Sequence, residues 1–160
     1  MIYLLEFKGI IEKALPNMGV AHIIRLLWDH RHECILIKEN NRVIGGVCFR
    51  MFEEAKFAEV AFLAIRQERR VQGFGQKVIN RLKNEMQARK VEFLLTYGDN
   101  MALGFFRKQG FSEKLTLNKK RWEGYIKEYD GGKLMECKIY PKVDYMKIND
   151  IIKKQKQFLI

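Results

Sequence analysis

Hydrophobic positions early in the chain first follow the period of a helix and then that of strands. Four apolar residues near the N-terminus recur at helical spacing: Val20, Ile23, Ile24 and Leu27. The next two segments, ECILIK and RVIGGVCFRMF, are rich in β-forming residues and flank the triplet ENN, which is typical of a hairpin turn. The sequence therefore predicts helical structure followed by an antiparallel pair of strands.

The middle of the chain contains a nearly continuous apolar run, FAEVAFLAI, from Phe57 to Ile65. Its β-forming residues predict a central strand that is covered on both faces. From Gly75 the period becomes helical, with an apolar face made of Val78, Ile79, Leu82 and Met86. The opposite face is expected to be polar and to contain Lys77, Arg81, Lys83 and Glu85.

The C-terminal half continues this alternation. VEFLLTY, from Val91 to Tyr97, predicts a strand. NMALGFFRKQG predicts a short helix with Asn100 as its N-cap and Gly110 just past its end. KLMECKIY, from Lys133 to Tyr140, predicts the last strand, and a final helix carries one stripe of Ile148, Ile151, Ile152 and Gln155. The predicted order is helices, hairpin, strand, helix, strand, helix, strand, helix.

Size and charge limit what such a chain can be. Its 160 residues, 48% of them hydrophobic, are enough for one well-filled core, so we expect a single domain over residues 1–160. Thirty Lys and Arg residues against nineteen Asp and Glu residues give a net charge of +11. This charge attracts polyanions such as nucleic acid, acidic membranes or a phosphate-bearing cofactor, without choosing among them. No apolar stretch approaches the ~20 residues that span a bilayer, which predicts a soluble protein without a membrane partner.

The cysteines indicate neither a metal site nor a disulfide framework. Cys34, Cys48 and Cys137 are widely spaced and odd in number, and the chain has no CxxC motif or Cys/His cluster. We therefore expect no metal cofactor and a reducing compartment.

Two glycines precede the amphipathic helix in the segment RRVQGFG. Glycine lets main-chain N–H groups approach an anion, and the first turn of a helix adds unpaired donors, so the segment is suited to a phosphate. The dinucleotide fingerprint fails because Val78 stands where its third glycine would be, and no Gly-Lys-Ser/Thr follows as in a P-loop. A plain turn before a helix is the alternative for the glycines alone.

The segment from Arg70 to Gly75 matches the acetyl-coenzyme A (acetyl-CoA) loop R/Q-x-x-G-x-G/A, and further blocks accompany it. They are VIGGVCFRMF, FAEVAFLAI, VQGFG, LLTYGDNMALGFFRKQGF and WEGYIKEYDGGKLMECKIYP, in that order. Together they resemble the GNAT acetyltransferases, and within them the catalytic domain of the general-control histone acetyltransferases. Close relatives of that type have Gln where Arg70 stands and Arg where Gln72 stands. The resemblance implies an α/β (α+β) GNAT fold, in which a mixed, mostly antiparallel sheet is flanked by helices and acetyl-CoA lies between two splayed central strands.

Glu59 is the candidate general base. Strict alternation along the strand places its carboxylate on one face with Phe57, Ala61 and Leu63, so we expect partial desolvation and a raised pKa. Such a carboxylate could take a proton from a lysine amine, whose ordinary pKa is about 10.4. The alternative is a structural carboxylate that is paired with a buried arginine or lies at a strand edge. The resemblance favours the base, since the glutamate of AEV has that role in the family.

The resemblance also implies a set of contacts with acetyl-CoA. The main chain at the end of the Phe57 strand would bind the pantetheine arm, and a Leu63 N–H would meet the thioester carbonyl as an oxyanion donor. The N–H groups of residues 71–76 would hold the pyrophosphate. Phe105 stands where many GNAT enzymes have a tyrosine general acid. The cofactor-binding residues that the resemblance implies are Leu63, Ala64, Ile65, Arg70, Val71, Gln72, Gly73, Phe74, Gly75, Gln76, Asn100, Ala102 and Phe105.

On the acceptor side, the resemblance implies a peptide groove with a wall made of Tyr97, Asp99, Tyr125, Tyr129 and Asp130. The alternative for the tyrosines is that they anchor a solvated loop to the core.

The implied function is direct transfer of the acetyl group from acetyl-CoA to lysine side chains of histone tails in a ternary complex. The expected partners are a histone tail and a multisubunit coactivator complex in the nucleus, with no sequence-specific contact to nucleic acid. One alternative is a GNAT enzyme that acts on another amine, such as a polyamine. Another is a non-catalytic chromatin or nucleic-acid binder driven by the positive charge.

Overall fold

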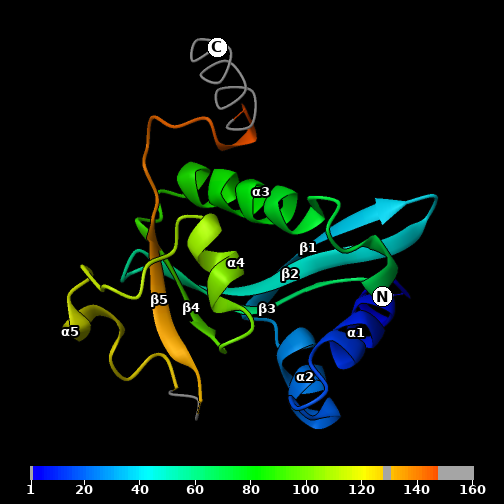
Figure 1. Ribbon diagram of the computed structural model, residues 1–160. Coiled ribbons are helices and arrows are strands. Elements are labelled where there is room, and N and C mark those ends of the chain that lie inside the picture. The colour runs from blue at the N-terminus through cyan, green and yellow to red at the C-terminus, as the bar shows by residue number, and fades with distance from the viewer. Residues whose placement is uncertain (1, 128–130, 148–160) are drawn as a thin grey trace.

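A mixed sheet forms the centre of the molecule, shown in Figure 1 as a computed structural model that describes residues 2–127 and 131–147. Within those residues the strands are β1 (His32–Glu39), β2 (Arg42–Phe52), β3 (Phe57–Ile65), β4 (Phe93–Gly98) and β5 (Lys133–Lys138). They lie side by side in chain order. Neighbours run antiparallel except β3 and β4, which are parallel. The predicted mixed, mostly antiparallel sheet is thus confirmed.

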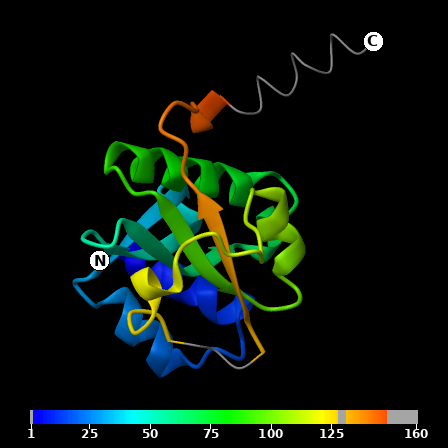
Figure 2. The same cartoon turned by 90° about the vertical axis from the view of Figure 1, so that its left-hand side faces the viewer.

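Helices cover both faces of this sheet (Figures 1 and 2). The described helices are α1 (Ile2–Ala14), α2 (Val20–Leu27), α3 (Phe74–Ala88), α4 (Leu103–Lys108) and α5 (Lys119–Trp122), with short 3₁₀ turns η1 (Gln67–Arg69) and η2 (Tyr145–Lys147). One apolar cluster joins α3 and α4 to the sheet, and a second joins α1 and α2 to its other face. A third cluster joins Trp122 of α5 to Phe57 and Leu95. In Figure 2, α5 (yellow) and α2 (blue) lie on the side of the sheet opposite α3.

Much of the predicted element order is confirmed. The predicted Phe57–Ile65 strand has those bounds as β3 and is flanked by two strands on each side. Asn40 and Asn41, between β1 and β2, have φ values of 52° and 61°. Two successive residues with positive φ make the mirror-image turn that matches the twist of a hairpin. The predicted helix over Ile148–Gln155 lies outside the described residues.

Two local predictions are wrong. Lys83 is only 6% exposed and does not lie on a solvated face of α3, because its ammonium donates a hydrogen bond to the Gln109 carbonyl. Asn100 is not the N-cap of α4, since the Asp99 carboxylate accepts the hydrogen bond from the Ala102 N–H at 2.8 Å. The expectation for Gly110 is confirmed, because this residue follows α4 with φ of +94°.

The central parallel pair separates along its length. β3 and β4 are paired only from Phe57–Phe93 to Val60–Thr96, although β3 continues to Ile65. At the last pair, the Thr96 hydroxyl donates a 3.1 Å hydrogen bond to the Val60 carbonyl. The expected splay between these two strands is therefore present, and it opens at their carboxyl ends.

A β-bulge in β3 reverses the direction of its side chains. Opposite β2, Phe49 pairs with Val60 and Cys48 with Phe62, so Ala61 is an extra residue. Before the bulge Val60 packs into the α3 cluster, and after it Phe62 packs into the α1 and α2 cluster. Leu63 consequently packs toward α3. The expectation that Glu59 and Leu63 share a face is wrong, because strict alternation does not survive an inserted residue.

Candidate active site

Glu59 lies between two apolar clusters on the face of the sheet opposite α3. Its alternation with Val60 places it on the side of Phe57 and Ala61, which pack into the α5 cluster and the α1 and α2 cluster respectively. The side chain is half-buried. Burial raises the pKa of this carboxyl to about 7, although the positive charge of Arg50 acts in the opposite direction. At neutral pH a large fraction of such a group is deprotonated and able to accept a proton, and its raised pKa makes it a stronger base than an ordinary carboxylate.

Arg50 stands directly opposite Glu59 in the neighbouring strand. Its guanidinium lies over the Phe52 ring, 4.6 Å from the centroid. Among residues 2–127 and 131–147 no hydrogen bond or ion pair joins the two side chains. The geometry therefore disfavours the alternative of a structural carboxylate paired with a buried arginine.

The glycine loop connects the end of β3 to α3. Gly73 adopts the left-handed conformation, with φ of 83°, and α3 begins at the next residue. Val71 is fully exposed and also has positive φ, at 66°. The first N–H groups of a long helix have no partner within the helix, and the positive end of its dipole lies beside them. The loop therefore has the backbone geometry of an anion site.

Gly75 brings α4 against this loop. A Cβ at Gly75 would lie 3.0 Å from the Phe105 ring, closer than most real contacts. Ala102 and Phe105 pack against the α3 cluster together with Leu63. Leu63, Ala102 and Phe105, three of the predicted contacts with the pantetheine arm, therefore lie on the face of the sheet that α3 covers. Asn100, in contrast, is exposed in the turn before α4.

The backbone of the last β3 residues has a free side. Leu63, Ala64 and Ile65 pair with β2, but none of them pairs with β4 among the described residues. On the β4 side the Ile65 carbonyl accepts a hydrogen bond from the Arg70 guanidinium. Leu63 has no strand partner there among the described residues, which leaves its main chain available to an extended ligand in the manner of an added strand.

Three arginines around the loop hold it in place, and two of them, Arg66 and Arg69, were not singled out by the sequence patterns. Arg69 forms a bidentate pair with Glu39 at 2.9 Å for both contacts, and also donates to Gln72. Arg66 donates to the Val43 carbonyl at 2.6 Å. Arg70, predicted to bind the cofactor, donates a 3.4 Å hydrogen bond to Ile65. Glu39 and Val43 belong to the β1–β2 hairpin, so the sequence around the loop carried no signal for these two contacts.

The predicted peptide-groove residues are only partly brought together. Tyr125 packs edge-on against Phe52 and Phe57, with ring centroids 5.5 and 6.3 Å apart, and is therefore on the face of Glu59. Tyr97 packs against the same α5 cluster. The Asp99 carboxylate caps the turn before α4, which gives it a structural role. Tyr129 and Asp130 lie outside the described residues.

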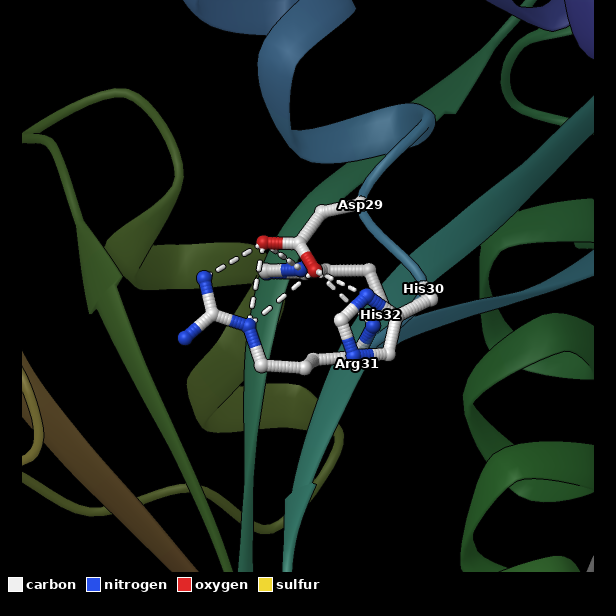
Figure 3. A network of polar contacts seen from close by, with 4 residues as sticks. All are labelled: Asp29, His30, Arg31 and His32. Atoms are coloured by element: carbon white, nitrogen blue, oxygen red, sulfur yellow. Dashed lines mark hydrogen bonds and ion pairs between the residues drawn. The ribbon is translucent and has the colours of Figure 1, made fainter.

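A separate polar network lies at the beginning of β1 (Figure 3). Asp29 accepts hydrogen bonds from the Arg31 N–H at 2.9 Å and from its guanidinium at 2.7 Å. These bonds hold the pKa of Asp29 well below its usual range. The network borders a shallow hollow of about 600 Å³ that Ile24 and Trp28 also line. No predicted site residue lines this hollow, so we assign the network to the turn between α2 and β1.

Comparison with known proteins connects this geometry to a family. The profile described as "Acetyltransferase (GNAT) family" matches residues 10–111. The histone acetyltransferase GCN5 of Oryza sativa subsp. japonica is 44% identical over 158 residues, covering 98% of this chain and 31% of that protein. The corresponding protein of Yarrowia lipolytica is 40% identical, covering 99% of this chain and 35% of that protein. The chain thus spans about a third of the length of these curated relatives.

Solved structures show the same similarity. The crystal structure of Tetrahymena GCN5 superposes with a TM-score of 0.86 at 47% identity, covering 89% of each chain. The Tetrahymena GCN5 catalytic domain in complex with coenzyme A superposes with a TM-score of 0.73 at 46% identity, covering 91% of this chain and 88% of that one. An aminoglycoside 6'-N-acetyltransferase complexed with coenzyme A has a TM-score of 0.67 at only 12% identity, covering 88% and 93%, so it shows the fold alone.

Proposed function

The chain belongs to the acetyltransferase (GNAT) family, and from that premise we propose that it transfers acetyl groups from acetyl-CoA to lysine side chains of histone tails. The observation that carries the proposal is Glu59, a half-buried carboxyl with a pKa of about 7 that forms no hydrogen bond or ion pair with an arginine among the described residues. The proposed substrate is inferred from the relatives named histone acetyltransferase, which match nearly the whole chain.

The chain's residues fit acetyl-CoA. The separation of β3 from β4 leaves one side of residues 61–65 without a strand partner among the described residues, where a pantetheine amide chain can hydrogen-bond. The left-handed Gly73 and the start of α3 present N–H groups suited to a pyrophosphate. When bound, acetyl-CoA supplies an activated thioester. We therefore propose that the main chain of residues 63–65 holds the pantetheine arm and that residues 71–76 hold the pyrophosphate.

Glu59 is proposed to remove the proton from the attacking lysine amine. At pH ~7.4 an amine with a pKa of about 10.4 is almost entirely protonated, and its deprotonation costs about 4 kcal/mol. A carboxylate with a pKa of about 7 can accept that proton better than an ordinary, more acidic carboxylate. The Glu59 side chain lies on the face opposite α3, whereas the proposed cofactor contacts Ala102 and Phe105 pack on the α3 side. The base and these contacts therefore approach the reaction from opposite faces of the sheet.

The leaving thiol has no acidic side chain at the position where many members of the family have a tyrosine. Phe105 occupies it and cannot donate a proton. We propose that the thiolate departs without a protein general acid and is protonated by water.

The acceptor peptide is proposed to bind on the face of Glu59. Tyr125 is 55% exposed and packs over Phe52 and Phe57, so its ring can lie along the aliphatic stem of a lysine. We further propose that the domain acts in the nucleus as part of a multisubunit coactivator complex, in keeping with the relatives' name.

The test measures transfer of labelled acetyl from acetyl-CoA to a histone-tail peptide and to spermidine. The native protein is compared with Glu59→Gln and with the control Glu54→Gln, which makes the same change in the exposed turn before β3. We expect Glu59→Gln to lower peptide acetylation on the order of 10²-fold or more while coenzyme A binding persists, and Glu54→Gln to behave as native.

Other results would change the proposal. Acetylation of spermidine without acetylation of the peptide would overturn the histone substrate and leave the fold and cofactor in place. Absence of both activities and of coenzyme A binding in the folded protein would overturn the enzyme assignment. A native rate in Glu59→Gln would exclude this residue as the base.

A further inference from the structure

The β1–β2 hairpin places two of the cysteines side by side. Cys34 in β1 is the direct partner of Cys48 in β2. Both side chains pack into the α1 and α2 cluster, so they are on the same face of the sheet. Side chains that face each other across an antiparallel pair have Cβ atoms about 4.5–5.5 Å apart. A disulfide needs a Cβ–Cβ distance of about 3.5–4.5 Å, so the two cysteines need to move together only slightly for the bond to form.

The two thiols differ in accessibility and acidity. Cys34 is half-buried at the edge strand, whereas Cys48 is completely buried. The Cys48 thiol is close enough to hydrogen-bond to the Cys34 sulfur, and this contact lowers the pKa of Cys34. The same contact, together with burial, raises the pKa of Cys48. Because Cys34 is the thiol of the pair that solvent can reach at the edge strand, it is the member that meets a dissolved oxidant and reacts as a thiolate.

We propose that Cys34 and Cys48 form an oxidisable dithiol that closes reversibly into a cross-strand disulfide when hydrogen peroxide is the oxidant. The Cys34 thiolate attacks one peroxide oxygen, the O–O bond breaks, and hydroxide leaves as Cys34 becomes a sulfenic acid. The Cys48 sulfur then attacks the Cys34 sulfur, its proton combines with the departing hydroxide, and water leaves. Two thiols are oxidised by two electrons and the peroxide is reduced to two waters.

The expected bond is readily reduced. Bringing the two Cβ atoms closer than the sheet spacing strains the disulfide, and strained disulfides have more oxidising potentials than structural ones. The pair therefore stays reduced in a reducing compartment and closes only while oxidant is present. The third cysteine, Cys137, is 4% exposed in β5, and it contacts Lys83 rather than another thiol. It provides an internal control.

The test treats the native protein with hydrogen peroxide, blocks remaining thiols with an alkylating reagent, and maps the peptides by mass spectrometry. We expect the loss of two hydrogen atoms, a linked peptide pair containing Cys34 and Cys48, and recovery of both thiols on adding a phosphine reductant. Cys137→Ser should give the same product. Cys34→Ser should abolish it, while Cys48→Ala should leave a Cys34 sulfenic acid that dimedone traps.

Three outcomes would overturn the proposal. They are a Cys34 oxidised only to sulfinic acid with Cys48 still a thiol, a disulfide that includes Cys137, and a bond between two molecules. Circular dichroism of each variant establishes that the fold is retained. If the core variant Cys48→Ala does not fold, Cys34→Ser still tests the proposal, because Cys34 is only half-buried and its replacement disturbs the core less.

Discussion

At the scale of single residues, the proposed chemistry depends on Glu59 and on the groups packed around it. A carboxylate inside an apolar strand predicts partial burial and a raised pKa, and the structure has both. The position of Arg50 could not be predicted, because it depends on the register between β2 and β3. The Asp29 network was missed for a related reason, since its hydrogen bonds depend on the shape of a turn.

Arg50 sets the pH range in which Glu59 can act as a base. Its positive charge lowers the pKa of the carboxyl, so Arg50→Gln should raise that pKa. Because the base works when deprotonated, the acidic limb of the pH profile of kcat/KM should move to higher pH. Arg42→Gln is the control, since its side chain is 64% exposed at the beginning of the same strand. An unchanged profile in Arg50→Gln would contradict the electrostatic role.

Glu59 should also reduce the stability of the domain at alkaline pH. Its folded pKa of about 7 exceeds the ordinary value of 4.5, so between these values the folded state binds more protons than the unfolded state, and stability falls as pH rises. Each pH unit is worth about 1.4 kcal/mol, so the cost approaches about 3 kcal/mol above pH 7. Urea unfolding should find Glu59→Gln more stable than native at pH 8 and similar at pH 4.5. Equal stability at both pH values would refute the raised pKa.

At the scale of elements, periodicity predicted most helices and strands, and tertiary context explains the errors. β4 and β5 differ from their predicted ranges only at the ends. Alternation failed at Ala61, because a bulge is decided by pairing with β2 and no glycine marks it. Lys83 was misplaced because its partner, the carbonyl after α4, is distant in sequence. The four-residue helix α5 is too short for a periodic signal.

The contact between the glycine loop and α4 should be sensitive to one methyl group. In Gly75→Ala the new Cβ would push on the Phe105 ring and shift either α4 or the loop. Coenzyme A affinity should fall by about tenfold, equivalent to about 1.4 kcal/mol. Gly104→Ala is the matched control, because nothing lies within 4 Å of a Cβ at that position in α4. Isothermal titration calorimetry of both variants measures the difference, and equal affinities would argue against a close-packed loop.

At the scale of the whole molecule, the net charge of +11 acts on every approaching ligand. It favours the polyanionic coenzyme and disfavours a cationic peptide at long range, so the acceptor depends on local carboxylates such as Glu59. No helix in the described part of the chain is long and apolar enough to cross a membrane. The amino-acid composition predicted this net charge, whereas the proposed positions of the coenzyme and of the acceptor amine depend on the fold.

The association rate of coenzyme A should therefore depend on salt. Long-range attraction is screened beyond about 10 Å at 0.1 M ionic strength and about 3 Å at 1 M, so the association rate constant should fall as sodium chloride is added. Dephospho-coenzyme A carries less charge and should have a shallower slope. Stopped-flow measurements with both ligands test this expectation, and identical slopes would exclude steering by the net charge.

The short ladder between β3 and β4 has a consequence for the energetics of the domain. In the described part of the chain, the strand pairs that join one part of the sheet, β1 to β3, to the other part, β4 and β5, run from Phe57–Phe93 to Val60–Thr96. A ligand that hydrogen-bonds to both strands in the gap between β3 and β4 connects the two parts of the sheet. Native-state amide exchange in residues 61–65 should then slow as coenzyme A is added, so that under the proposed function the lifetime of the folded domain depends on the supply of coenzyme.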